Sequence, residues 1–119
     1  MMSTTTIQIR VNAKNFTATL IDNDATAAFI KMLPLTLDMI ELNANEKYGD
    51  LAGPLPVHPI KPKTIQSGDL MLYGSTTLVL FYKSFPTSYS YTRLGAVDEV
   101  AGWANALGND DVRVAFELV

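Results

Sequence analysis

The sequence has no cysteine and only one histidine among its 119 residues. Without cysteine there can be no disulfide bond, no thiolate metal ligand and no cysteine nucleophile. A zinc site takes three or four ligands from histidine, cysteine and carboxylates, which a single histidine supports poorly. The chain also lacks a glycine-rich phosphate loop and a dinucleotide-binding fingerprint. We therefore interpret His58 as a solvent-exposed loop residue, and we expect no metal and no cofactor.

Long apolar runs are missing as well. The longest strongly apolar stretch covers residues 78–82, far short of the roughly 20 residues of a membrane helix. The first ten residues contain no basic region followed by an apolar stretch, as a signal peptide would. A net charge of −3 and a pI of about 4.9 argue against a nucleic-acid surface. We expect a cytoplasmic protein that binds neither nucleic acid nor membrane.

What the chain does have is the composition of a globular domain, with 48% hydrophobic and 18% charged residues. We expect a single domain over residues 1–119, in which residues 1–6 form a disordered N-terminal segment. Apolar and polar residues alternate along much of the chain, which is typical of half-buried strands. Strands are predicted over residues 7–11, 16–20, 35–42, 69–73, 77–82, 89–94 and 112–118.

Two short helices are predicted between these strands. The first covers residues 25–33, between a cluster of capping residues at 22–24 and Pro34. The second covers residues 98–107, with Asp98 as N-cap and Trp103 on its apolar face. Residues 43–62 carry four prolines and little periodicity, which indicates a long loop. Many strands and two short helices favour an antiparallel β-barrel whose ends the helices cover.

The chain resembles the cyclophilin-like domain family of small bacterial proteins over about residues 7–116. The most specific segments are NEKYG at 45–49, GDLMLYG at 68–74, FYKSF at 81–85 and YSYTRLG at 89–95. The resemblance implies a cyclophilin-like antiparallel β-barrel with two short α-helices. True cyclophilins carry Phe-His-Arg and Gln-Gly-Gly-Asp stretches that are absent here, and Trp103 falls on a predicted helix rather than in a loop. Isomerase activity therefore does not transfer residue by residue.

Tyrosines, one glutamate and one arginine form the candidate ligand-binding site. Its residues are Glu46, Tyr48, Tyr82, Tyr89, Tyr91 and Arg93. Tyrosine supplies flat apolar area with a hydroxyl, and arginine supplies a planar fork of donors. Such groups suit a peptide backbone, a carboxylate or a flat small molecule. The alternative is that the tyrosines pack at the barrel rim and Arg93 pairs with a carboxylate.

Strand alternation adds a geometric expectation to this site. Tyr89, Tyr91 and Arg93 are spaced by two, so an unbroken strand would point all three to one face. Leu94 would then face the barrel interior, and the 43–62 loop would bring Glu46 towards Arg93. Asp69, by contrast, follows Gly68 at a strand entry and is interpreted as a structural residue that accepts backbone amide hydrogens.

Three functions remain open at this point. We expect a non-catalytic binder of a peptide or small molecule, because no nucleophile or acid–base pair is recognisable. The first alternative is a peptidyl-prolyl cis-trans isomerase with a non-standard active site built around Arg93. The second is a structural subunit that forms a homo-oligomer through residues 43–62.

Overall fold

The computed structural model describes residues 5–119, and within them ten strands and two helices are formed. The strands are β1 (Thr5–Val11), β2 (Lys14–Leu20), β3 (Leu35–Leu42), β4 (Glu46–Asp50), β5 (Thr64–Ile65), β6 (Asp69–Tyr73), β7 (Thr77–Phe81), β8 (Phe85–Pro86), β9 (Thr92–Val97) and β10 (Val112–Leu118). The helices are α1 (Asp24–Ile30) and α2 (Trp103–Leu107). The mainly β fold with two short helices is confirmed.

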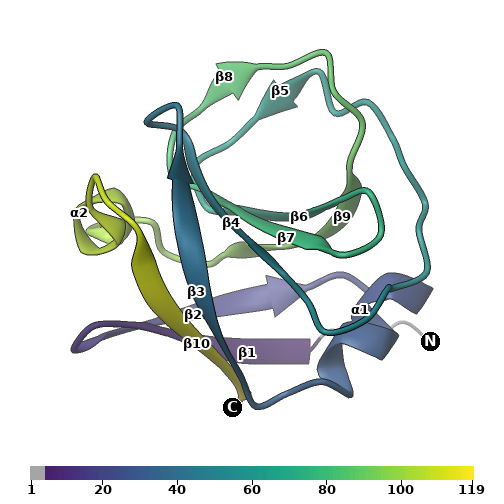
Figure 1. Cartoon of the computed structure of the whole chain (residues 1–119), viewed down its shortest axis with the longest axis horizontal. Helices are drawn as coiled ribbons and strands as arrows, with labels where there is room; N and C mark the ends of the chain where they lie inside the picture. Colours follow the sequence, from purple (N-terminus) through teal and green to yellow (C-terminus); the bar gives the residue numbers. More distant parts are fainter. Residues whose placement is uncertain (1–4) are drawn as a thin grey trace.

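Eight of the strands close into a barrel, as predicted. Their order around the barrel is β1-β10-β3-β4-β7-β6-β9-β2, and neighbours pair antiparallel. The remaining two, β5 and β8, pair with each other and stand apart from the barrel, above β6 and β7 in Figure 1. We call β5, β8 and the residues between β8 and β9 the outer lobe.

The N-terminal end of the barrel begins earlier than expected. Residues 1–6 were expected to be disordered, but Thr5 and Thr6 belong to β1, where they pair with Leu20 and Thr19 of β2. The hairpin therefore extends two residues further, because the backbone of β2 offers hydrogen-bonding partners along its whole length. Residues 1–4 lie outside the described residues.

Strand β4 was missed, because residues 43–62 were expected to form a loop. The four prolines of that segment all follow Asp50, so they do not prevent residues 46–50 from pairing. The β4 backbone pairs with β3 on one side and with β7 on the other. It is therefore a full wall strand of the barrel, and its side chains point alternately into the barrel and out of it.

The predicted strand at 89–94 is shifted to β9, Thr92–Val97. Tyr91 makes only an isolated bridge with Ile60. Gly95 lies inside β9, at a point where β2 is so close that a Cβ on this residue would be 2.3 Å from the carbonyl oxygen of Thr19. The register of β9 slips at Leu94, which faces the barrel interior as expected.

Both helices are shorter than predicted. Asn23 and Thr26 form a reciprocal capping box at the start of α1. Helix α2 begins at Trp103 rather than near Asp98, because the Asp98 carboxylate accepts hydrogen bonds from two hydroxyls of β2 and caps no helix. Trp103 is nonetheless fully buried, so α2 does cover the barrel interior.

The buried side chains form two clusters on the two faces of the β6–β7 hairpin. The interior cluster fills the barrel and takes side chains from β1, β2, β3, β6, β7, β9, β10 and both helices. The outer cluster consists of Ile65, Met71, Val79, Phe81 and Tyr91. Because strand residues alternate between faces, consecutive residues of β6 and β7 supply opposite clusters. The outer lobe contributes Ile65 and Tyr91 to the outer cluster, and the β6–β7 hairpin contributes the other three residues.

Candidate functional site

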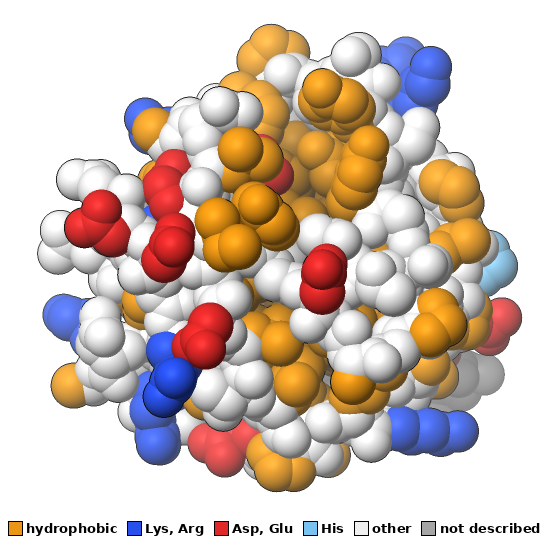
Figure 2. All heavy atoms as spheres, in the orientation of Figure 1, with side chains coloured by type: hydrophobic (Ala, Val, Ile, Leu, Met, Phe, Trp, Pro, Cys, Tyr) orange, Lys and Arg blue, Asp and Glu red, His pale blue; other side chains and the backbone are white. Residues whose placement is uncertain are grey.

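A pocket of about 550 Å³ lies on the outer face of the barrel, beside the outer cluster. Its floor and one wall come from β4, β6 and β7, and its other wall comes from the outer lobe. Figure 2 shows hydrophobic side chains gathered around a hollow between the outer lobe and the β6–β7 hairpin. The lining residues are Leu42, Asn43, Asn45, Glu46, Tyr48, Tyr73, Thr77, Val79, Phe85, Pro86, Thr87, Ser88, Tyr89 and Tyr91. We call it the tyrosine pocket.

Aromatic rings extend from the mouth of the tyrosine pocket to its floor. The ring centroids of Tyr73 and Tyr89 are 6.2 Å apart with the planes at 89°. Tyr73 and Tyr91 are 5.8 Å apart at 59°. Tyr89 is 61% exposed and Tyr73 48%, whereas Tyr91 is only 5% exposed and packs edge-on against Phe81. The exposed rings therefore form walls at an angle to each other, and the buried ones form the base.

Glu46 is the one carboxylate among the residues that line the tyrosine pocket. It is half-buried, and within residues 5–119 its side chain makes no hydrogen bond and no ion pair. Burial, together with the nearby charge of Glu41, raises the pKa of Glu46 to about 7. Burial and the charge of Glu46 also raise the pKa of Tyr91. The pocket therefore holds a carboxyl group that changes charge near neutral pH.

The next residue of β4, Lys47, faces the opposite way and is fully buried. Its Nζ donates hydrogen bonds to Glu41 Oε1 at 2.9 Å, to the Gly108 carbonyl at 2.9 Å and to the Asp110 carbonyl at 2.6 Å. The ammonium also lies 5.3 Å from the centre of the Tyr82 ring. This buried ion pair is well satisfied, since each ammonium proton has an acceptor.

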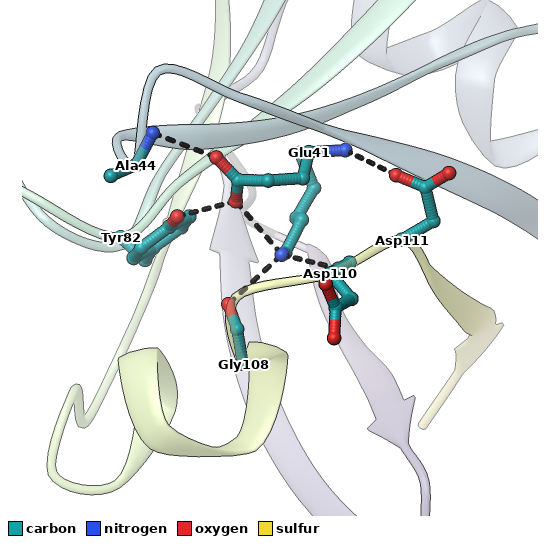
Figure 3. A network of polar contacts seen from close by, with 7 residues as sticks. Glu41, Ala44, Tyr82, Gly108, Asp110 and Asp111 are labelled. Carbon is teal, nitrogen blue, oxygen red and sulfur yellow. Dashed lines mark hydrogen bonds and ion pairs between the residues drawn. The ribbon is translucent and has the colours of Figure 1, made fainter.

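Glu41 joins three parts of the chain around this lysine (Figure 3). Its carboxylate accepts hydrogen bonds from the Tyr82 hydroxyl and the Ala44 amide, and its own amide donates to Asp111. Burial acts to raise the pKa of Glu41, but the hydrogen bonds from Tyr82, Lys47 and Ala44 outweigh it and lower that pKa. Burial and the bond to Glu41 raise the pKa of Tyr82. The network fastens β3, β4 and the turn after α2 together.

A family model described as the Cyclophilin-like family matches residues 9–117. This chain belongs to the Cyclophilin-like family. A structure determined in solution, of a hypothetical protein from Archaeoglobus fulgidus, is similar with a TM-score of 0.62 and 14% sequence identity. The match covers 100% of this chain and 98% of that one, and at this identity it shows a shared fold alone. No curated protein matches this chain.

The cyclophilin-like barrel brings together four of the six predicted site residues. Glu46, Tyr48, Tyr89 and Tyr91 line the tyrosine pocket. Tyr82 lies instead in the network around Lys47, with its hydroxyl bound to Glu41. Sequence reasoning missed Tyr73, Phe85 and Lys47. For Lys47 the available signal was its alternation with the outward-facing Glu46 and Tyr48. This alternation was overlooked because residues 43–62 were interpreted as a loop.

Arg93 is not among the pocket residues. Arg93 lies in β9 and pairs with Met71 of β6, and its backbone carbonyl accepts a hydrogen bond from the Asn23 side chain at 3.0 Å. In the part of the chain that the structure describes, no carboxylate lies within ion-pair distance of its guanidinium. The expected alternation with Tyr89 and Tyr91 fails because β9 begins at Thr92, so the three residues do not share one regular strand.

Two minor interpretations agree with the structure. Asp69 is 4% exposed and accepts the Gln66 amide at 2.9 Å, which is the expected structural role. His58 lies exposed on the surface, 3.8 Å from a carboxylate oxygen of Asp24.

Across residues 5–119 no three His, Asp or Glu side chains gather as metal ligands. Over the same residues, neither helix has the length or hydrophobicity to cross a membrane.

Proposed function

We propose that this cyclophilin-like protein binds a small organic molecule, or one side chain of a peptide, in the tyrosine pocket. The observation that carries the proposal is a cleft of about 550 Å³ walled by aromatic rings on the outer face of the barrel. Ligand sites of soluble proteins have volumes of roughly 300–1,000 Å³ and a mostly apolar lining with a few polar groups. The tyrosine pocket has both properties.

The exposed rings support binding rather than a packing role. Tyr73 and Tyr89 keep about half or more of their surface in contact with solvent, so neither contributes much to the interior cluster. Large aromatic side chains gathered in one exposed place are typical of a recognition surface. Asn43, Asn45 and Ser88 in the lining add hydrogen-bonding groups around the apolar base.

The chemistry of the lining favours binding over catalysis. Glu46 is the one carboxyl group of the lining, and no second acid or base in the described chain lies within hydrogen-bond reach of it. The isomerase alternative placed Arg93 beside the tyrosines, and no observation favours it, since Arg93 lies outside the pocket. The homo-oligomer stays a prediction, which light scattering tests directly.

A titration followed by NMR of the backbone amides tests the proposal. The probes are phenethyl alcohol and N-acetylphenylalanine amide, two uncharged molecules that each carry one aromatic ring. We expect the largest shift changes at Val79, Phe85 and Tyr91, around the base of the pocket. Shift changes scattered over the barrel, or none near saturating probe, would contradict the proposal.

Two variants sharpen the test. Tyr89→Ala removes one wall ring and should weaken binding of either probe by about threefold to tenfold. Val100→Ala is the matched control, because Val100 is 42% exposed but lies outside the pocket. Equal affinities in the two variants would show that the rings do not hold the ligand.

A further inference from the structure

We infer that the tyrosine pocket selects an organic cation, a protonated amine or quaternary ammonium group that sits between the tyrosine rings and Glu46. The inference rests on the proposed function and adds to it the charge of the ligand. Three independent features of the described residues carry it: the angle between the rings, the unpaired carboxylate, and the position of the neighbouring lysine.

The rings have the arrangement that an ammonium group requires. The face of an aromatic ring is negative, so a cation within roughly 6 Å of the ring centre is attracted to it. Tyr73 stands perpendicular to Tyr89 and tilted by 59° against Tyr91. Rings at such angles form a corner in which one small cation contacts more than one ring. Parallel stacked rings would instead favour a flat aromatic ligand.

Glu46 supplies the charge that balances such a cation. Its carboxyl group is partly withdrawn from water yet has no partner in the described residues. A buried carboxylate without a partner is costly, and an ammonium group that donates to it offsets that cost. A neutral ligand offsets less of it, and an anion adds repulsion.

The lysine next in sequence does not neutralise Glu46. Lys47 points to the other side of β4, where its ammonium is held by Glu41 and two backbone carbonyls. Glu41 and Lys47 balance each other, so Glu46 carries the remaining charge of this group. The residues that line the pocket include no lysine, arginine or histidine. The pocket is therefore negative whenever Glu46 is ionised.

A single carboxylate with aromatic walls fits an organic cation better than a metal ion. Calcium takes roughly six to eight oxygen ligands and magnesium about six in a strict octahedron. The tyrosine pocket offers one carboxylate, and its remaining polar groups are amides and hydroxyls. Aromatic side chains contribute no metal ligands beyond the tyrosine hydroxyls, whereas they contribute directly to ammonium binding.

The test uses three probes that share a phenethyl group and differ in charge: phenethylamine, phenethyl alcohol and hydrocinnamate. At about pH 8, where Glu46 is ionised, we expect the amine to bind about tenfold tighter than the alcohol, and the carboxylate probe to bind weakest. Glu46→Gln should lower the amine affinity severalfold, to the smaller preference that the rings alone give a cation, and should lower the alcohol affinity much less. Glu117→Gln, an exposed glutamate outside the pocket, should change neither.

A pH series with the unaltered protein keeps the test independent of the variant's folding. The ionisable groups that act on Glu46 electrostatically are Glu41, Tyr82 and Tyr91, of which Tyr91 lines the pocket; the pKa of Glu41 is lowered and those of the tyrosines are raised. Glu46 is therefore the group of this site that titrates between about pH 5.5 and pH 8. The amine affinity should fall severalfold as the pH drops through this range, while the alcohol affinity stays constant.

The outcomes distinguish the inference of a cationic ligand from the proposed binding function. Equal binding of amine and alcohol in the tyrosine pocket would overturn the cation inference and leave the proposed function intact. Failure of all three probes to shift the pocket amides would overturn both. An amine preference that is as large in Glu46→Gln as in the unaltered protein would overturn the role assigned to Glu46.

Discussion

The two faces of the β6–β7 hairpin carry apolar clusters of different character. On the inner face Leu70, Leu72, Leu78 and Leu80 are fully buried and aliphatic. On the outer face the cluster is richer in aromatic rings and borders an open pocket. The inner cluster has neighbours from the whole barrel, whereas the outer one is covered by a lobe with a two-stranded sheet. One hairpin thus separates a packed core from a surface with room for a ligand.

The same contrast appears within two consecutive residues of β4. Lys47 points inward and is saturated with hydrogen bonds. Glu46 points outward and has no partner among residues 5–119. Alternation in a strand therefore places a structural ion pair and a free carboxylate side by side in sequence. We expect changes on the inner face to lower stability, and changes on the outer face to alter binding with little loss of stability.

The largest loss of stability is expected for Lys47→Ala. The substitution removes the ammonium from Glu41 and from two backbone carbonyls, so the free energy of unfolding should fall by about 3–5 kcal/mol. Urea unfolding followed by the fluorescence of the buried Trp103 measures it. Lys14→Ala, at an exposed lysine of β2, is the control and should stay within about 0.5 kcal/mol. A loss below about 1 kcal/mol for Lys47→Ala would contradict the structural role.

Two leucine substitutions compare the stability contributions of the inner and outer faces directly. Leu80→Ala removes a fully buried side chain of the interior cluster and should cost about 2–5 kcal/mol. Leu42→Ala removes a pocket side chain that is 40% exposed and should cost less than about 1 kcal/mol. Both are measured by urea unfolding. Equal losses would mean that the outer surface is as tightly packed as the interior.

The pH dependence of stability should report Glu46. Its pKa in the folded protein, about 7, lies above its ordinary value of 4.5. Its contribution to stability is therefore complete below the ordinary pKa and is lost as the pH rises through the folded one. Glu46→Gln should match the unaltered protein in acid and exceed it by about 1–2 kcal/mol near pH 8, after allowance for solvent screening.

The control for this prediction is Glu117→Gln, which should leave the pH profile unchanged. The acid side of the profile should persist in both variants, because the lowered pKa of Glu41 gives a stabilisation that is lost as the pH falls below its ordinary value of 4.5. A Glu46→Gln profile parallel to that of the unaltered protein up to pH 8 would show that Glu46 is hydrated like a surface residue.

The smallest effect on stability is expected for Tyr89→Ala. Tyr89 is 61% exposed, so its loss should change the free energy of unfolding by less than about 0.5 kcal/mol. Thermal unfolding measures this. A loss above about 2 kcal/mol would favour the alternative from the sequence, in which the tyrosines are rim packing.

The sequence predicts those parts of the fold that depend on local patterns. Strict alternation in β1, β2 and β10 gives the strands within a few residues, and the polar cluster before α1 gives its start. Strand β4 depends on two distant partners, β3 and β7. Its five residues carry no strong local signal, and the prolines that follow hid it.

The candidate site was predicted only in part, because it also depends on contacts between strands that are distant in sequence. Its tyrosines stand out by residue type, but the pocket depends on which face of each strand turns outward. Arg93 was included on the assumption that the strand begins at Tyr89, whereas the pairing with β6 starts only at Thr92. Tyr73 is the last residue of the strand predicted at 69–73, and its position at the end of β6 leaves it half-exposed beside the pocket. Register between distant strands is set by tertiary contacts, which no local pattern contains.

The outer lobe interrupts two connections of the barrel, the one between β4 and β6 and the one between β7 and β9. The barrel closes without it, because each of the eight wall strands already has two neighbours. Insertions, deletions and residue exchanges in this lobe therefore leave the scaffold's hydrogen-bond ladder intact. One wall of the binding site is in this way free to diverge in evolution, or to be randomised in a library, while the other wall and the fold stay constant.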